Sequence, residues 1–192
     1  KRQLTRSVIS YLISFGFALS LAVISLFFAP AYKLLSPVVS VLRALPTMAV
    51  VLLLIIWTGP KTATVIVALL VIFPTLYSLF YESMTRVDRD VIDMAKIDGA
   101  DKTILAFRFY IPLAAPMASR SAAGALSLCV KLTVAAEVLA STAGSLGAMM
   151  QTYRVYFETA RLMALTTLTV IVSLLLEAIL YRLLRLSFKN WI

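Results

Sequence analysis

Two charged residues, Lys131 and Glu137, lie within one long apolar stretch and are the first candidates for chemistry in this sequence. A charge near the centre of a bilayer is costly and usually faces protein or water. Lys131 could therefore attract an anionic solute, and Glu137 could shape an outer gate. Both could instead be structural, with Lys131 snorkelling or pairing and Glu137 lying at a helix end, which is our preferred interpretation for Glu137. Their spacing of six residues puts them about 240° apart around a helix, so they are not expected to pair.

Glu177 is a further charged residue inside an apolar stretch. Arg161, Arg182 and Arg120 are conceivable partners, and the sequence does not decide between them.

Catalytic chemistry has little support. The chain has no histidine, which is the commonest general base and metal ligand, and its single cysteine, Cys129, offers no disulfide framework or metal cluster. It also has no Gly-x-x-x-x-Gly-Lys-Ser/Thr loop to cradle phosphates. An intramembrane enzyme is therefore the lowest-ranked hypothesis, and we expect this chain to bind no cofactor and no metal.

A polar segment, residues 82–111, interrupts the apolar pattern. Apolar residues recur there at helical spacing, which predicts a short amphipathic helix of about three turns: Val87, Val91, Met94, Ala95 and Ile97. Asp88 is placed to cap its start, and Gly99 to end it in a left-handed conformation. Asp101 would then cap a second short helix, Lys102–Phe109, that runs into Pro112. Such a pair suits a docking element, although an ordinary surface loop that caps the bundle is the alternative.

The rest of the chain must position these residues, and its composition indicates a membrane. Of 192 residues, 61% are hydrophobic, against about 45–50% in soluble domains. A spanning helix needs about 20 mostly apolar residues, which predicts an all-α integral membrane domain over residues 1–192. Its five expected spans are Ser7–Ala29, Pro37–Thr58, Thr62–Tyr81, Pro112–Glu137 and Leu162–Leu184. The Gly/Ser-rich stretch Val138–Arg161 is expected to be peripheral or partly re-entrant.

The charged residues that give the net charge of +9 lie between the apolar stretches. This distribution indicates membrane topology and does not indicate nucleic-acid binding. If residues 82–108 are cytoplasmic, ten basic residues lie inside and six outside, which favours a cytoplasmic C-terminus. Three of the six belong to the N-terminal residues Lys1, Arg2 and Arg6, which oppose the rule. The chain begins with lysine, so a further helix upstream in a longer protein is an open alternative.

The segment Asp93–Ala100, followed by Phe109-Tyr110-Ile111-Pro112, resembles the "EAA" signature of ATP-binding-cassette importer permeases. That pattern is Glu-Ala-Ala, three residues and Gly, then a spacer to Ile-x-Leu-Pro. The spacing matches from Asp93 to Pro112, and the four departures keep charge or apolar character. Further segments resemble the nitrate/sulfonate/taurine branch, which also includes thiamine-precursor permeases: Arg43–Thr47, Ile56–Gly59, Phe73-Pro74, Lys131–Glu137 and Gly144–Gly147. Members of that branch usually show an additional N-terminal helix, and often Trp where this chain has Val130.

The resemblance implies a type I importer permease fold in the bacterial inner membrane and no enzymatic activity in this chain. It implies two permease copies, here expected as a homodimer, two cytoplasmic ATPase subunits that bind ATP and Mg²⁺, and an extracytoplasmic solute-binding protein. The expected ATPase-coupling residues are Asp93, Ala95, Gly99, Ala100 and Asp101, and Lys131 and Glu137 are the expected pathway residues. The expected substrate is a small organic anion or a thiamine-precursor-type molecule. A non-transporting membrane scaffold that uses the same fold is the alternative.

Overall fold

The computed structural model describes residues 2–141 and 144–189, and every secondary-structure element in those residues is helical. Elongated helices form the bundle: α1 (Arg2–Phe27), α2 (Ala29–Ala44), α4 (Pro60–Thr85), α7 (Ile111–Ala140) and α9 (Thr159–Lys189). Shorter helices connect them: α3 (Thr47–Thr58), α5 (Arg89–Ile97), α6 (Lys102–Ile104), the π-helical turn η1 (Leu105–Tyr110) and α8 (Leu146–Val155).

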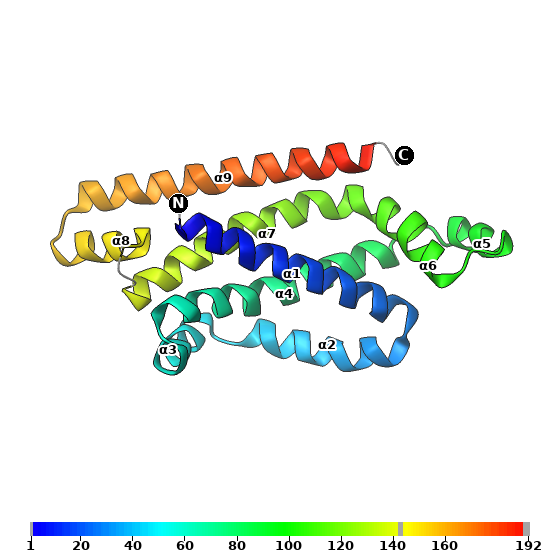
Figure 1. The fold of residues 1–192 in the computed structure, drawn as a ribbon, viewed down its shortest axis with the longest axis horizontal. Coiled ribbons are helices and arrows are strands. Elements are labelled where there is room, and N and C mark those ends of the chain that lie inside the picture. Colours follow the sequence, from blue (N-terminus) through cyan, green and yellow to red (C-terminus); the bar gives the residue numbers. More distant parts are fainter. Residues whose placement is uncertain (1, 142–143, 190–192) are drawn as a thin grey trace.

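The long helices run roughly side by side, with the connecting helices gathered at the two ends of the bundle (Figure 1). One end carries α5 and α6, and α9 also finishes there. The opposite end carries α3 and α8. The arrangement therefore separates the predicted docking element from the Gly/Ser-rich stretch by the full length of the bundle.

Four helical stretches of the described chain are long and apolar enough to cross a membrane, or five if the bent pair α2 and α3 counts as one span. The prediction of about five spans in an all-α membrane domain is thus confirmed. The first, third, fourth and fifth predicted spans each lie almost wholly within one helix: α1, α4, α7 and α9.

The second predicted span, Pro37–Thr58, is wrong as a single helix. The chain there forms α2 and α3, which meet at an angle of 91°. Leu45 is extended (φ −64°, ψ 130°) because the ring of the following Pro46 disfavours the helical conformation of the preceding residue. The Leu45-Pro46 pair was the available signal for this bend. Gly59, with φ +78°, then reverses the chain into α4, and Pro60 is the first residue of that helix.

Small side chains and buried hydroxyls bring α1, α4 and α7 together. Ala18, Ala22 and Ala122 are almost fully buried, which lets the helix backbones approach closely. The Tyr11 hydroxyl donates to the Ala122 carbonyl at 2.7 Å, and the Tyr77 hydroxyl donates to Ser25 Oγ at 2.8 Å. These polar groups are satisfied inside the protein, as a bilayer interior requires.

Candidate coupling site and pathway surface

The short helix α5 is seated on the bundle by a small apolar cluster. Its Ile92 and Ala95 are buried together with Leu105 of η1, and Phe27 and Tyr110 pack against them. The rings of Phe27 and Tyr110 meet edge to face, 5.7 Å apart. The seat therefore ties α5 both to the end of α1 and to the start of the long helix that includes α7.

The start of α5 follows the sequence prediction. Asp88 is the N-cap, and its carboxylate accepts the N–H of Asp90 at 3.0 Å. An acidic cap accepts a hydrogen bond from a free backbone N–H, and its negative charge stabilises the helix by lying at the positive end of the helix dipole.

The end of α5 is a Schellman turn built by three predicted coupling residues. The N–H of Ala100 donates to the Ala95 carbonyl at 3.0 Å, and the N–H of Gly99 donates to the Lys96 carbonyl at 3.0 Å. Gly99 has φ +84°, in the left-handed region that this turn requires. Ala95, Gly99 and Ala100 thus belong to one turn, in which only position 99 has a backbone conformation that favours glycine.

The opposite side of α5 is apolar and exposed. The sequence pattern grouped five apolar residues, but the structure divides them: Ala95 is buried, whereas Val91, Met94 and Ile97 face outward, with Ile97 85% exposed. Sequence reasoning missed the buried role of Ile92, although its position three residues before Ala95 could have indicated it. An exposed apolar tip on a short helix outside the spans is typical of a surface that another protein covers.

Asp93 lies on the exposed side as well, and its carboxylate is bridged by Lys96 Nζ at 2.7 Å. The hydrogen bond to Asp93 raises the pKa of Lys96 above its ordinary value. Both side chains are more than half exposed, so this pair adds little to folding stability. Its charges remain accessible from solution.

The segment after Gly99 differs from the prediction of a second separate helix, Lys102–Phe109. Asp101 does cap a helix start, since its carboxylate accepts the N–H of Ile104 at 2.8 Å. However, the helix continues without a stop from Lys102 to Ala140, first as α6, then as the wider turn η1 and then as α7. The predicted polar loop is shorter for the same reason, because α4 extends to Thr85 and helix resumes at Lys102.

The π-helical turn η1 lies directly before Pro112. Proline cannot donate a backbone hydrogen bond, and its ring would crowd the carbonyl four residues earlier in a regular α-helix. The wider turn accommodates this, and such turns often mark functional segments. The link from α5 to the membrane interior is therefore one continuous helix.

Lys131 lies on the exposed face of α7, about two thirds of the way along that helix. The exposed residues of α7 fall within a stripe about 140° wide, formed by Leu113, Pro116, Met117, Arg120, Ser121, Leu128, Lys131 and Leu139. Charges inside a membrane usually face protein or water, so two cations on one stripe favour a surface that is not wholly lipid-facing.

Glu137 is fully buried inside the chain, on a different side of α7 from Lys131. The two residues do not form one site within this chain. Gly147 of α8 packs directly on Glu137: a Cβ atom on Gly147 would lie 2.5 Å from the Glu137 Cβ. Ser145 caps α8 by accepting the N–H of Ala148 at 3.1 Å. The Gly144–Gly147 segment thus holds α8 against the C-terminal end of α7, and α8 is too short to span, as predicted for this stretch.

Glu177 shares a cleft with Arg120 and not with the other two predicted partners. Arg161 is bridged to Glu158 at 2.6 Å instead, and Arg182 lies on the exposed side of α9. The cleft has a volume of about 250 Å³ and lies between α7 and α9.

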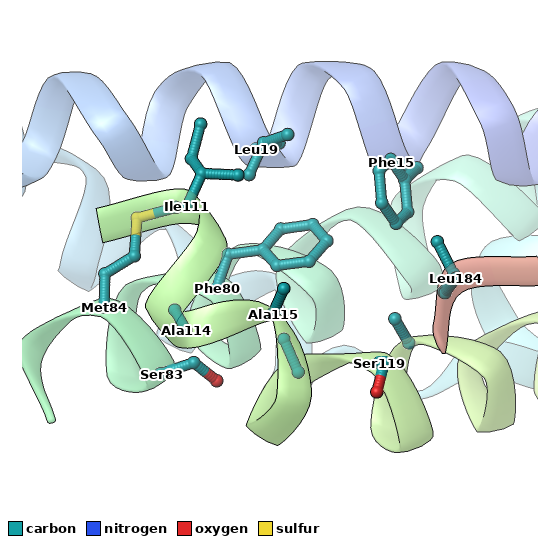
Figure 2. Close-up of a pocket in the computed structure, with 12 residues that line it drawn as sticks. Phe15, Leu19, Phe80, Ser83, Met84, Ile111, Ala114, Ala115, Ser119 and Leu184 are labelled. Carbon is teal, nitrogen blue, oxygen red and sulfur yellow. The ribbon is translucent and has the colours of Figure 1, made fainter. Parts of the chain in front are cut away.

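A second cavity, of about 160 Å³, lies between α1, α4, α7 and the end of α9 (Figure 2). Phe15, Phe80 and Leu184 wall it, and Ser83 and Ser119 are its polar residues. The Ser119 hydroxyl donates to the Pro116 carbonyl at 3.1 Å. No charged side chain lines this cavity, so it does not suit a charged solute.

Comparisons with known proteins agree with this architecture. The curated relatives include the riboflavin transport system permease protein RibX of Chloroflexus aurantiacus, 33% identical over 77% of this chain and 58% of that protein. They also include a probable ABC transporter permease protein of Brucella melitensis, 29% identical over 67% of this chain and 52% of that protein. The chain thus spans little more than half the length of these relatives.

The fold matches a chain in two inward-facing structures of the MetNI methionine ABC transporter. The first has a TM-score of 0.82, 18% identity, and covers 95% of this chain and 91% of that chain. The second has a TM-score of 0.78 and 19% identity, and the match covers 96% of this chain and 94% of that chain. The predicted type I importer permease fold is therefore confirmed. The family model of the binding-protein-dependent transport system inner membrane component matches residues 8–190, and this chain belongs to that family.

Proposed function

We propose that this chain is the transmembrane permease subunit of an ATP-driven importer, which forms the translocation pathway and couples it to a separate ATPase. The observation that carries the proposal is α5: a short helix outside the spans, closed by the Ala95–Gly99–Ala100 turn, with Val91, Met94 and Ile97 exposed. Its buried side is tied to the helix that continues as α7. A push on the exposed tip would therefore move a membrane-spanning element directly.

The proposed partners follow from this arrangement and from the family. Two ATPase subunits, which hold ATP and Mg²⁺, bind α5 of two permease copies in a homodimer, and Asp93 and Asp101 contribute the local negative charge. An extracytoplasmic solute-binding protein delivers substrate at the opposite end, near α3 and α8. This chain itself hydrolyses no ATP and binds no cofactor. The membrane is the bacterial inner membrane, with α5 and the C-terminus on the cytoplasmic side.

The exposed stripe of α7 is the proposed wall of the pathway. Lys131 lies on that stripe and would attract an anionic solute in a water-filled space. Glu137 acts differently, since it is buried under Gly147 and would fix the outer end of α7 without touching the solute. The substrate is proposed to be a small organic anion, sulfonate, taurine or nitrate-like, or a heterocycle such as a thiamine precursor. The riboflavin permease relative supports the heterocyclic class.

A test is to purify the chain with the ATPase encoded beside it and measure co-purification and solute-stimulated ATP hydrolysis in liposomes. Asp93→Arg and Gly99→Pro should abolish assembly and stimulation. Gln151→Ala, on α8 at the opposite end, is the matched control for assembly and should leave co-purification of the ATPase intact. Full assembly and transport in both α5 variants would refute the coupling role. Assembly of the unaltered complex without any stimulation by a binding protein would favour the scaffold alternative.

A further inference from the structure

The cleft between α7 and α9 contains a pair of opposite charges inside the membrane region. It is lined by Arg120 and Ala123 of α7 and by Leu174, Glu177, Ala178 and Tyr181 of α9. Glu177 lies four residues from the centre of the apolar run Leu162–Leu184, which is about 6 Å along the helix axis. The hydrocarbon core extends about 15 Å to either side of its centre, so this carboxylate lies well within it.

The two charges line one cleft without a direct ion pair. Within the residues that the structure describes, no ion pair within 4.0 Å and no hydrogen bond joins Arg120 or Glu177 to another side chain. Glu177 reaches across to α7, where a Cβ on Gly124 would lie 3.8 Å from its Oε1. At that distance an added Cβ would make an ordinary contact, so Glu177 lies directly against α7 at Gly124. Charges at this depth that make no direct pair favour water or a polar ligand between them.

We propose that this cleft is a solute-contact site in the inner half of the pathway, for a small molecule with an anionic group and a cationic donor group. The inference rests on the proposed function. The Arg120 guanidinium binds the anionic group, which it can hold in a two-pronged geometry. Glu177 accepts from the cationic group, and the Tyr181 hydroxyl supplies a further hydrogen-bonding group. The volume of about 250 Å³ suits a small zwitterion.

This site differs from the Lys131 position in chemistry as well as in depth. Lys131 presents a positive charge alone on the stripe of α7, whereas the cleft offers both signs within one space. A monovalent anion would leave Glu177 without a counter-charge. A solute with both groups satisfies the cleft, which narrows the proposed substrate class towards amino-sulfonate or amino-carboxylate molecules.

The test uses thiol labelling of the whole transporter in inside-out membrane vesicles. Ala178→Cys places a thiol in the cleft, and Ile179→Cys places one at the same depth about 100° around α9. Charged methanethiosulfonates report access from water, and native Cys129 is buried. We expect Ala178→Cys to react at least tenfold faster than Ile179→Cys. Arg120→Gln should slow the anionic reagent relative to the cationic one, and Glu177→Gln should do the reverse.

The class of ligand is determined in the same vesicles, by measuring which compounds protect the Ala178→Cys thiol from labelling. Millimolar taurine should slow labelling of Ala178→Cys several-fold, whereas ethanesulfonate and ethylamine should not, and Arg120→Gln or Glu177→Gln should remove the protection. Labelling no faster than at Ile179→Cys, or equal protection by all three compounds, would each overturn the proposal. Co-precipitation of the ATPase is measured in parallel. Loss of ATPase co-precipitation would count against the proposed function. If the ATPase still co-precipitates, a negative labelling result counts against this site alone.

Discussion

The backbone N–H of Ala100 donates to the carbonyl of Ala95 across the end of α5, at 3.0 Å. This bond joins the first and last residues of the turn that ends the exposed helix, and Gly99 between them supplies the left-handed backbone. Backbone geometry therefore favours glycine at position 99, whereas Ala95 and Ala100 contribute backbone groups that other residues could also supply. Ala95 in addition must stay small, since it is buried against Leu105.

Substitutions at Gly99 should act through the backbone alone. Nothing lies within 4 Å of a Cβ added there, so Gly99→Ala meets no clash, but its φ of +84° costs a side-chain-bearing residue about 1–2 kcal/mol. Hydrogen exchange of the α5 amides should accelerate about tenfold, and ATPase co-purification should weaken. Gly99→Asn, which tolerates this conformation better, should lie between Ala and the parent. Equal exchange in all three proteins would contradict the Schellman assignment.

Gly147→Ala should destabilise the folded protein, because its Cβ would lie 2.5 Å from Glu137 Cβ and from the Val138 backbone nitrogen. The backbone cannot yield cheaply, so we expect a loss of about 1–3 kcal/mol and a lower midpoint of thermal unfolding in detergent. Gly16→Ala is the matched control, since a Cβ there meets no atom within 4 Å in the middle of α1. A Gly147→Ala protein that melts with the parent would show that α8 moves freely on α7.

Replacement of the exposed apolar tip of α5 should abolish docking without unfolding the permease. Met94→Lys and Ile97→Asp alter side chains that are 66% and 85% exposed, so the folded subunit should melt normally. Apolar anchors at the centre of an interface commonly contribute 2 kcal/mol or more, so affinity for the ATPase should fall by about thirtyfold or more. Surface binding of the purified ATPase to permease nanodiscs measures this, and Gln151→Lys controls for added charge. Unchanged affinity would place the ATPase contact elsewhere.

The Asp93–Lys96 pair should be insensitive to pH over the neutral range. Its hydrogen bond raises the pKa of Lys96 above 10.5, so the folded state binds the lysine proton more tightly than the unfolded state does. The pair's contribution is then fully present below the unfolded pKa and disappears only as pH rises through the higher folded pKa. Lysine Nζ titration by NMR should show this upward shift, and Asp93→Asn should remove it. An unshifted titration in the parent protein would show that the pair does not form in solution.

Much of the architecture was predictable from the sequence because it depends on local signals. Apolar stretches of spanning length predicted α1, α4, α7 and α9. Short-range cap signals predicted the start of α5 at Asp88, its end at Gly99 and the next helix start at Asp101. The predicted span Pro37–Thr58 missed the bend between α2 and α3, because hydropathy alone does not distinguish a straight apolar helix from a broken one. Pro46 was the local signal for the bend.

The candidate site was less predictable where it depends on packing between distant segments. The sequence placed Lys131 and Glu137 on different sides of a helix but could not say that Glu137 is covered by Gly147. It identified Glu177 without its neighbour, since the cleft with Arg120 arises only when α7 and α9 lie against each other. The exposure of Met94 and Ile97 could not be predicted either. The periodicity of α5 does not reveal which of its two apolar sides packs against the bundle.

The uninterrupted helix from Lys102 to Ala140 spans 39 residues, or about 58 Å at 1.5 Å per residue. Such a rod is nearly twice as long as the hydrocarbon core is thick. If it rocks about its midpoint by about 5°, its two ends move by about 2.5 Å in opposite directions, given that length. One end carries the seat of α5 and the other carries Glu137 beneath α8. Opening on one side of the membrane and closing on the other would then be a single lever movement, with no relay of side chains between the two faces.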